Sequence, residues 1–213
     1  MKSIYRPKVE DISNLKAMDV TIGKLIDLVG DVEFEIIDDP FLALVNSIIY
    51  QQLSFKAANT IWNRVVSLVG DISPERIIEI RHEDLRTCGV SNSKAGYIKN
   101  VANAFIDNGY SRVYFDQLSD EDVVAELIKI KGIGKWTADM FLIFCLGREN
   151  VLSFADLSIK NGLVWLYKLD REIKKSDYDD FHNLFSPYNT LASLYIWKIQ
   201  ENKFDRYESI EKI

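Results

Sequence analysis

The fold is decided by the stretch Leu127-Ile-Lys-Ile-Lys-Gly-Ile-Gly-Lys-Trp-Thr-Ala138. Two glycines one residue apart, Gly132 and Gly134, permit a tight turn with positive φ between two helices. Before the turn, Asp120 to Ile130 is predicted to be a helix, and a second, apolar helix is predicted from about Lys135 to Leu146. Ile133 lies between the glycines and is expected to tuck into the core. The stretch therefore predicts a rigid helical hairpin over residues 127–140.

Such a hairpin suits a phosphate group. The turn aims the free amides of the second helix outward, and the positive end of the helix dipole lies there. Lys131 and Lys135 flank the turn and add positive charge. These contacts hold a nucleic-acid backbone without reading any base. The alternative is a plain corner between two helices with lysines on the surface, and the Gly-x-Gly spacing alone favours that alternative.

Outward from the hairpin, the chain is a series of helices with short connections. Asp39 and Pro40 open an apolar helix over Phe41 to Leu53, and its length favours a buried helix over a strand. Further helices are predicted from the Ser54 cap to Gly70, from Ser73-Pro74-Glu75, from Ser93 to Gly109, from Ile159 to Tyr167 and from Asn189 to Gln200. No repeat, strand hairpin or Gly/Ser-rich linker stands out, so the sequence predicts one all-α domain.

Charge argues against a general nucleic-acid binder. The 213 residues carry a net charge of −6, with 26 basic and 32 acidic side chains. An acidic chain binds DNA only if its basic groups gather on one face. No apolar run is long enough to span a membrane, and residues 1–7 do not resemble a secretory signal. Cys88 and Cys145 are expected to be buried, reduced thiols, so we expect a bacterial cytosol or nucleoid.

The second informative stretch is Asn150-Val-Leu-Ser-Phe-Ala-Asp156-Leu-Ser-Ile-Lys160. It places an acidic residue in an apolar setting at the start of a helix. Taken alone, Asp156 is best explained as the N-cap of that helix, which is a common role for aspartate.

Together, these stretches resemble the helix–hairpin–helix DNA glycosylases, and most closely the branch that removes 3-methyladenine and other alkylated bases. The resemblance rests on five motifs in order, from about Pro40 to Trp197: Ile48-Ile-Tyr-Gln-Gln-Leu-Ser54, Leu85-Arg-Thr-Cys-Gly-Val-Ser-Asn-Ser-Lys-Ala95, Gly132-Ile-Gly-Lys-Trp-Thr-Ala138, Phe154-Ala-Asp156-Leu-Ser-Ile-Lys160 and Pro187-Tyr-Asn-Thr-Leu-Ala192. It implies an all-α fold of two helical lobes with the active site between them, and excision of damaged bases from double-stranded DNA.

The resemblance also implies roles for single residues. Asp156 matches the catalytic aspartate. Trp136 stands where members that also cut the strand carry a Schiff-base lysine, which implies a glycosylase without lyase activity. Gln52 matches the residue that fills the gap left by the extruded base, with Leu53 as a near alternative.

Other positions are implied to bind the base or the backbone. Trp136, Tyr188 and Met140 would line the base pocket. Phosphate binding would fall to Gly132, Gly134, Lys135 and Thr137. Carbonyls near Ile130 and Ile133 could hold a monovalent cation, and the resemblance implies no other metal or cofactor.

The sequence also departs from the family pattern. Lys131 stands where proline is frequent, and Asn189 stands where arginine is frequent. The larger bacterial members carry an N-terminal β domain, for which about forty residues leave no room. We expect a monomer whose partner is damaged duplex DNA. Three alternatives stay open: an oxidised-base glycosylase with lyase activity, a non-catalytic helix–hairpin–helix module, and a helical protein with no nucleic-acid role.

Overall fold

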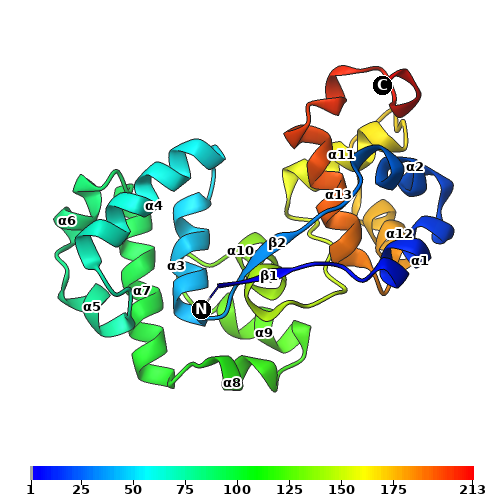
Figure 1. Cartoon of the computed structure of the whole chain (residues 1–213). Helices are drawn as coiled ribbons and strands as arrows, with labels where there is room; N and C mark the ends of the chain where they lie inside the picture. Colours follow the sequence, from blue (N-terminus) through cyan, green and yellow to red (C-terminus); the bar gives the residue numbers. More distant parts are fainter. Residues whose placement is uncertain (1) are drawn as a thin grey trace. The chain divides into compact units, whose positions relative to one another are not determined.

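The computed structural model describes residues 2–213 and is helical through most of that length (Figure 1). Its contacts divide the chain into two compact units. Unit 1 holds residues 2–3 and 36–146, and unit 2 holds residues 4–35 and 147–213. The predicted all-α class is confirmed. None of the helices in the described part of the chain is both long and apolar enough to cross a membrane.

Unit 1 is built around α3 (Pro40–Tyr50), an apolar helix that packs against α4, α7 and α10. Its buried side chains include Phe41, Leu44 and Ile48. The other helices of the unit are α4 (Phe55–Val69), α5 (Pro74–Glu79), α6 (His82–Thr87), α7 (Asn92–Asn108), α8 (Arg112–Asp116), α9 (Asp120–Leu127) and α10 (Lys135–Phe141), which continues as a π-helical turn over Leu142–Leu146. Because α3 is apolar nearly all round, it forms the centre of this unit.

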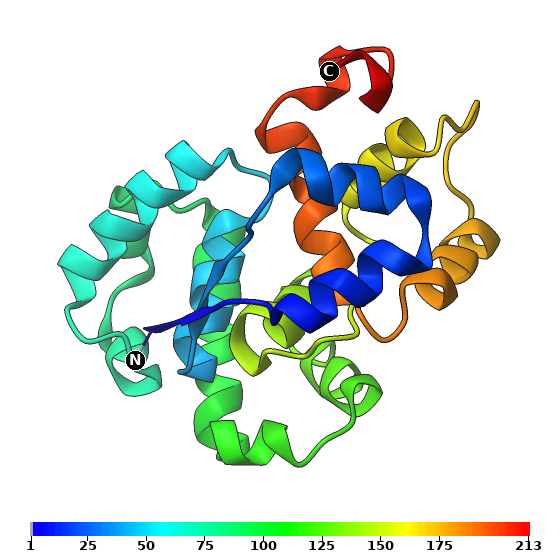
Figure 2. The ribbon, with the colours of Figure 1, turned by 45° about the vertical axis from the view of Figure 1, so that its right-hand side comes forward.

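Unit 2 is built around α13 (Asn189–Glu201), which packs against α2 and α11 and is seen beside α2 in Figure 2. Tyr195, Ile196 and Ile199 on α13 are fully buried. The other elements of the unit are α1 (Val9–Met18), α2 (Val20–Val29), α11 (Leu157–Leu166), α12 (Lys175–Phe185) and two 3-10 turns, Phe204–Arg206 and Ile210–Lys212. This core fixes the position of α11 and of the residue before it, Asp156.

Two short strands were not predicted from the sequence. β1 (Lys2–Tyr5) and β2 (Phe34–Ile37) pair as a two-stranded sheet. The rings of Tyr5 and Phe34 lie with centroids 4.9 Å apart. The strands have four residues each and are joined by two helices rather than by a tight turn, so no local hairpin signal marks them.

The predicted helix starts are mostly confirmed by their capping bonds. The side chains of Asp39, Ser54 and Ser73 accept backbone N–H groups of α3, α4 and α5. One start is corrected: α7 is capped by Ser91 rather than opened by Ser93. One end is also corrected, because α3 stops at Tyr50, whereas the apolar run continues to Leu53.

Candidate functional site

The hairpin of unit 1 joins α9 to α10 as the sequence predicts. Its backbone is closed by hydrogen bonds from Ile130 N to Leu127 O (3.0 Å) and from Ile133 N to Ile130 O (3.0 Å). Ile130 and Ile133 are only 7% and 5% exposed. The turn is therefore anchored by two buried apolar side chains.

The backbone geometry at position 132 accommodates only glycine. Its φ is +110°, and a Cβ placed on it would lie 2.2 Å from Cγ of Tyr97 on α7. The same helix holds the turn through Asn100, whose Nδ2 donates to Lys131 O at 3.0 Å. Tyr97 and Asn100 were not singled out from the sequence, and no local pattern marks them, because their partners lie more than thirty residues away.

Gly134 differs from Gly132. It is the N-cap of α10, with φ −103° and no side-chain capping bond. No described atom lies within 4 Å of a Cβ placed on it. The first-turn N–H groups of α10 have no intrahelical acceptor. The start of α10 therefore has no side-chain cap, and the space beside Gly134 is open.

The other two residues predicted to bind phosphate have partners inside the protein. Lys135 is 58% exposed, and its Nζ forms an ion pair with Asp139, one turn further along α10 and fully buried. Thr137 is 1% exposed, and its Oγ1 accepts from Gln51 Nε2 at 2.9 Å. The buried side chain of Thr137 is thus bonded to Gln51.

The turn after α3 carries the predicted duplex wedge. Gln51 is the C-cap of α3, and Gln52 adopts a left-handed φ of 55°. Gln52 is exposed and Leu53 is 40% exposed. The side chain of Gln51 donates to Gly132 O at 3.2 Å as well as to Thr137. Gln51 therefore ties this turn to the hairpin, a role that sequence reasoning did not assign although the Gln-Gln pair was noticed.

Trp136 and Met140 follow the hairpin on one face of α10. They are spaced one helical turn apart, so their side chains lie on the same side of the helix. Trp136 is half-buried and Met140 is 6% exposed. An aromatic face beside a thioether gives this part of unit 1 a polarizable surface.

In unit 2, Asp156 is the N-cap of α11, as predicted from the sequence around it. Its Oδ1 accepts from Ile159 N at 3.0 Å, and the residue is 7% exposed. The preceding segment, residues 151–153, is buried as well. The carboxylate is thus fixed at the N-terminus of α11.

Aromatic and amide groups surround this end of α11 and α13. Lys160 Nζ lies 4.1 Å from the ring centroid of Phe154. Tyr188 is half-buried, and its hydroxyl accepts from Asn14 Nδ2 at 2.9 Å. Asn189 is fully buried, and its Nδ2 donates to Asn150 Oδ1 at 2.7 Å and to the His182 carbonyl at 2.9 Å. Asn189, which stands where arginine is frequent in the family, therefore lies in the interior of unit 2.

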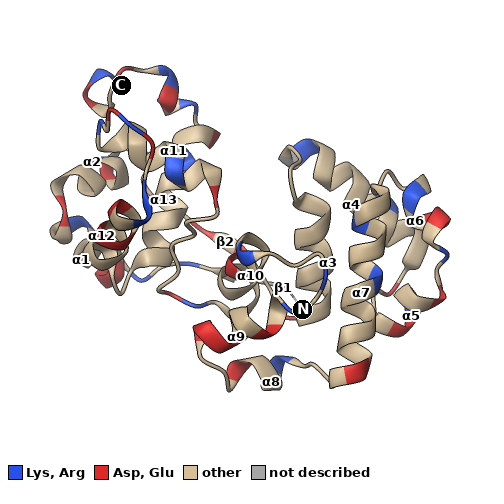
Figure 3. Ribbon diagram, turned by 180° about the vertical axis from the view of Figure 1, so that it is seen from behind, with Lys and Arg blue, Asp and Glu red and all other residues tan. Residues whose placement is uncertain are grey.

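Acidic and basic side chains occur together on many helices, and acidic ones are most frequent on α9 and α12 (Figure 3). Acidic side chains crowd α9 (Asp120, Glu121, Asp122) and α12 (Asp177, Asp179, Asp180), whereas the hairpin carries Lys129, Lys131 and Lys135. Two of these lysines form ion pairs, Lys129 with Glu126 and Lys135 with Asp139.

The family described as "HhH-GPD superfamily base excision DNA repair protein" matches residues 45–186, which contain the hairpin, the turn after α3 and Asp156. The chain belongs to this superfamily. The HhH-GPD chain is 34% identical over 195 residues to DNA-3-methyladenine glycosylase 1 of Schizosaccharomyces pombe, covering 87% of this chain and 84% of that protein. The resemblance drawn from the five motifs is confirmed.

Two solved structures are similar to the HhH-GPD chain over nearly its whole length. The DNA-3-methyladenine glycosidase of Bacillus halodurans is 34% identical with a TM-score of 0.81, covering 99% of this chain and 98% of that one. The 3-methyladenine DNA glycosylase of Schizosaccharomyces pombe, in complex with abasic DNA, is 33% identical with a TM-score of 0.83, covering 91% and 97%. The helix–hairpin–helix glycosylase fold is thereby established for this chain.

The two cysteines of the HhH-GPD chain are buried and unbridged, as predicted. Burial raises the pKa of the Cys145 thiol to about 12, and burial raises the pKa of Cys88 as well. The thiolate is the nucleophilic form of cysteine. Neither cysteine is therefore suited to accept an alkyl group directly from a damaged base.

Proposed function

We propose that this chain is a monofunctional DNA glycosylase that excises alkylated bases such as 3-methyladenine from duplex DNA, with Asp156 as the catalytic carboxylate. The proposal rests chiefly on one observation: Asp156 is almost buried and is fixed by its bond to Ile159 N, at the position that matches the family's aspartate. The names of the two full-length relatives support the choice of alkylated bases.

Excision of an alkylated base requires few catalytic groups besides this carboxylate. A base alkylated at a ring nitrogen is cationic and leaves as a neutral molecule, so no general acid is required. His82 and His182, the only histidines, lie on the helices α6 and α12 and have no part in the proposed reaction. The sugar left behind develops oxocarbenium-like positive charge, which a fixed anion in a dry site stabilises. Asp156 would also orient the attacking water.

Strand cleavage needs a lysine amine as a Schiff-base nucleophile. Position 136 holds tryptophan, and the neighbouring Lys135 is paired with the buried Asp139. An ammonium group held by a buried carboxylate is a poor nucleophile. This pairing favours a simple glycosylase over the alternative, an oxidised-base glycosylase with lyase activity.

Electrophoresis of alkylated duplex after incubation with the protein tests the monofunctional reaction. Strands that stay intact after the incubation and then break at the modified purines in mild alkali, while alkylated duplex incubated without protein stays intact, are the expected result. Breaks without alkali would establish lyase chemistry. Binding of the duplex with no alkali-labile sites formed would instead favour the non-catalytic helix–hairpin–helix module.

The hairpin would hold the DNA backbone. The uncapped N-terminus of α10 and the open space at Gly134 are suited to a phosphate oxygen, and Lys131 adds charge. A monovalent cation at the carbonyls near Ile130 and Ile133 stays a prediction. Ile130 O already accepts Ile133 N, which leaves it one lone pair for such an ion. We also propose that residues 1–213 form a single glycosylase domain and act as a monomer in the bacterial cytosol or nucleoid, where the DNA lies.

Gln52→Ala is expected to slow excision from a fully paired duplex by about tenfold, because nothing then fills the space of the extruded base. Single-turnover rates on one lesion in a matched duplex measure the effect. Leu53→Ala is the companion variant, and we expect a smaller loss from it. A larger loss of rate in Leu53→Ala than in Gln52→Ala would identify Leu53 as the wedge. Wild-type rates in both variants would show that neither residue fills the space of the extruded base.

Trp136→Ala is expected to reduce the preference for cationic over neutral bases by about 2- to 30-fold, the equivalent of a cation–π contact of about 0.5–2 kcal/mol. Relative rates on 7-methylguanine and hypoxanthine duplexes measure the preference. Trp136→Phe keeps an aromatic face and should retain most of it. Equal preference in wild type and Trp136→Ala would show that Trp136 only packs. Tyr188, whose hydroxyl is held by Asn14, is proposed as a second aromatic contact.

A further inference from the structure

The wedge turn, residues 51–53, is held in place by polar contacts. Gln52 has a left-handed backbone, which is unusual for a residue other than glycine or asparagine and persists only where its surroundings hold it. Within the turn, Leu53 N donates to Tyr50 O at 3.3 Å. From one side, Gln51 ties the turn to the hairpin through Gly132 O and Thr137 Oγ1.

From the other side, the turn is held by Lys94 of α7. The Lys94 Nζ donates to Ile49 O at 2.9 Å and to Gln51 O at 2.6 Å. These carbonyls belong to the end of α3, where the last C=O groups lack helical partners and the dipole is negative. An ammonium group satisfies both needs at once, so Lys94 acts as a cationic cap on the helix that leads into the wedge.

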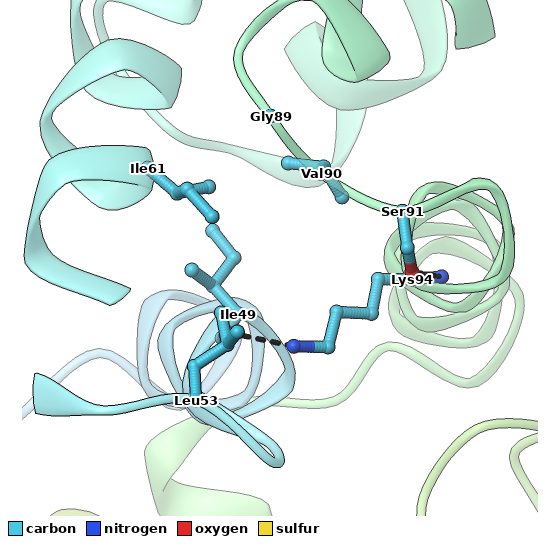
Figure 4. Close-up of a pocket in the computed structure, with 7 residues that line it drawn as sticks. All are labelled: Ile49, Leu53, Ile61, Gly89, Val90, Ser91 and Lys94. Carbon is cyan, nitrogen blue, oxygen red and sulfur yellow. Dashed lines mark hydrogen bonds between the residues drawn. The ribbon is translucent and has the colours of Figure 1, made fainter. Parts of the chain in front are cut away.

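A half-open pocket of about 80 Å³ borders the turn; it is lined by Ile49, Leu53, Ile61 and Val90, with Lys94 at its edge (Figure 4). Side chains that face an open pocket make fewer van der Waals contacts than fully packed ones. Burial also lowers the pKa of Lys94, so the protein bears a desolvation cost to keep the ammonium at this place. Hydrogen bonds from Lys94 and Gln51 therefore hold the turn from two sides.

We propose that Lys94 is a positioning residue for base extrusion: its ammonium fixes the turn that drives Gln52 and Leu53 into the duplex. The proposal rests on the proposed function, because it assumes that residues 51–53 enter DNA. It assigns Lys94 no contact with the reacting atoms. The effect of losing Lys94 should therefore depend on whether the damaged base must still be extruded.

The same helix offers a matched control in Lys99. Its Nζ donates to Ile77 O at 2.6 Å, to Ile78 O at 2.9 Å and to Ile80 O. These carbonyls end α5 rather than α3. Burial lowers the pKa of Lys99 as well. Lys94 and Lys99 thus have the same kind of contact at two helix ends, and only one of those ends leads into the wedge.

Lys94→Met and Lys99→Met, each compared by melting temperature, separate positioning from stability. We expect similar losses of Tm. Lys94→Met should slow single-turnover excision of a lesion in a matched pair by about tenfold. On the same lesion opposite an abasic analogue, where no pair must be broken, the loss should stay below about threefold. Lys99→Met should leave both rates within about twofold, and Lys94→Arg should restore most of the paired-lesion rate because arginine also donates to carbonyls.

A double variant tests whether Lys94 acts through the wedge. In a Gln52→Ala background, Lys94→Met should slow paired-lesion excision by less than about threefold, because both substitutions impair the same wedge turn. Equal slowing of both substrates by Lys94→Met, or the same substrate dependence in Lys99→Met, would overturn the proposal. The proposal would also be overturned if the rate losses of Lys94→Met and Gln52→Ala were fully additive.

A readout without catalysis separates this proposal from the proposed function. A 2-aminopurine base placed beside an abasic analogue should brighten when wild type binds and unstacks it. Lys94→Met should reduce that rise at saturating protein, and Lys99→Met should not. If wild type releases no base but brightens the probe, and Lys94→Met reduces that rise, the proposed function fails and the role of Lys94 stands. If wild type excises and Lys94→Met brightens the probe fully, the role of Lys94 alone fails.

Discussion

Asp156→Asn is expected to reduce base excision by at least about 100-fold while leaving a folded protein that still binds damaged duplex. The substitution removes the negative charge that would stabilise the oxocarbenium-like sugar. It keeps the shape of the side chain and an oxygen that accepts from Ile159 N, so the cap on α11 survives. Single-turnover excision and duplex binding, measured on the same preparation, record the two properties separately.

Asp156→Ala is the control for the capping role. It loses both the charge and the cap, so it should excise as poorly as Asp156→Asn and should also lose about 1 kcal/mol of unfolding free energy. Asn is nearly as good an N-cap as Asp, so Asp156→Asn should melt close to wild type. If Asp156→Asn excises at the wild-type rate, Asp156 is only the cap of α11.

Gly132→Ala is expected to weaken DNA binding by at least about tenfold and to lower the unfolding free energy by about 1–3 kcal/mol. The added Cβ would stand 2.2 Å from Cγ of Tyr97, on a backbone with φ +110° that suits glycine. The hairpin must then shift, and the amides at the start of α10 shift with it. Chemical denaturation and titration of labelled duplex measure the two losses.

Gly134→Ala separates binding from stability. A Cβ there meets no described atom within 4 Å, and φ is −103°, so the fold should tolerate it. The methyl group would occupy the space where a phosphate is proposed to approach, so DNA binding should weaken at unchanged Tm. Wild-type affinity in both glycine variants would show that the hairpin does not hold the backbone.

Local signals predicted the hairpin and most helices of unit 1. The Gly-x-Gly turn with Ile133 buried between the glycines is found as predicted, and the caps at Asp39, Ser54 and Ser73 begin the predicted helices. Each of these features depends on residues within a few positions of one another. Sequence alone therefore carries them.

Features set by distant contacts were not predicted. The apolar run from Phe41 gives no sign that α3 ends at Tyr50, because the exit is fixed by Lys94 and by the bonds of Gln51 to the hairpin. The polar helix α12, with its three aspartates, and the helices α1 and α2 were likewise not foreseen. They are stabilised by burial against unit 2's core, which no local pattern reveals.

In the candidate site, too, features set by neighbouring residues were predicted and features set by distant contacts were not. Asp156 was predicted as a helix cap from its own neighbourhood, and that geometry is found. The pairing of Lys135 with Asp139 spans one helical turn and was within reach of a spacing argument, yet Lys135 was assigned to phosphate instead. The burial of the Thr137 side chain against Gln51 joins residues far apart in sequence, so it needed the fold.

Chromatography of what the protein releases from methylated duplex DNA tests the glycosylase activity and the role of Asp156 together. We expect free 3-methyladenine in the soluble fraction with wild type and none above background with Asp156→Asn at equal DNA occupancy. Release of methylated base by both proteins would contradict the role of Asp156. No release by wild type, with binding intact, would contradict the glycosylase itself.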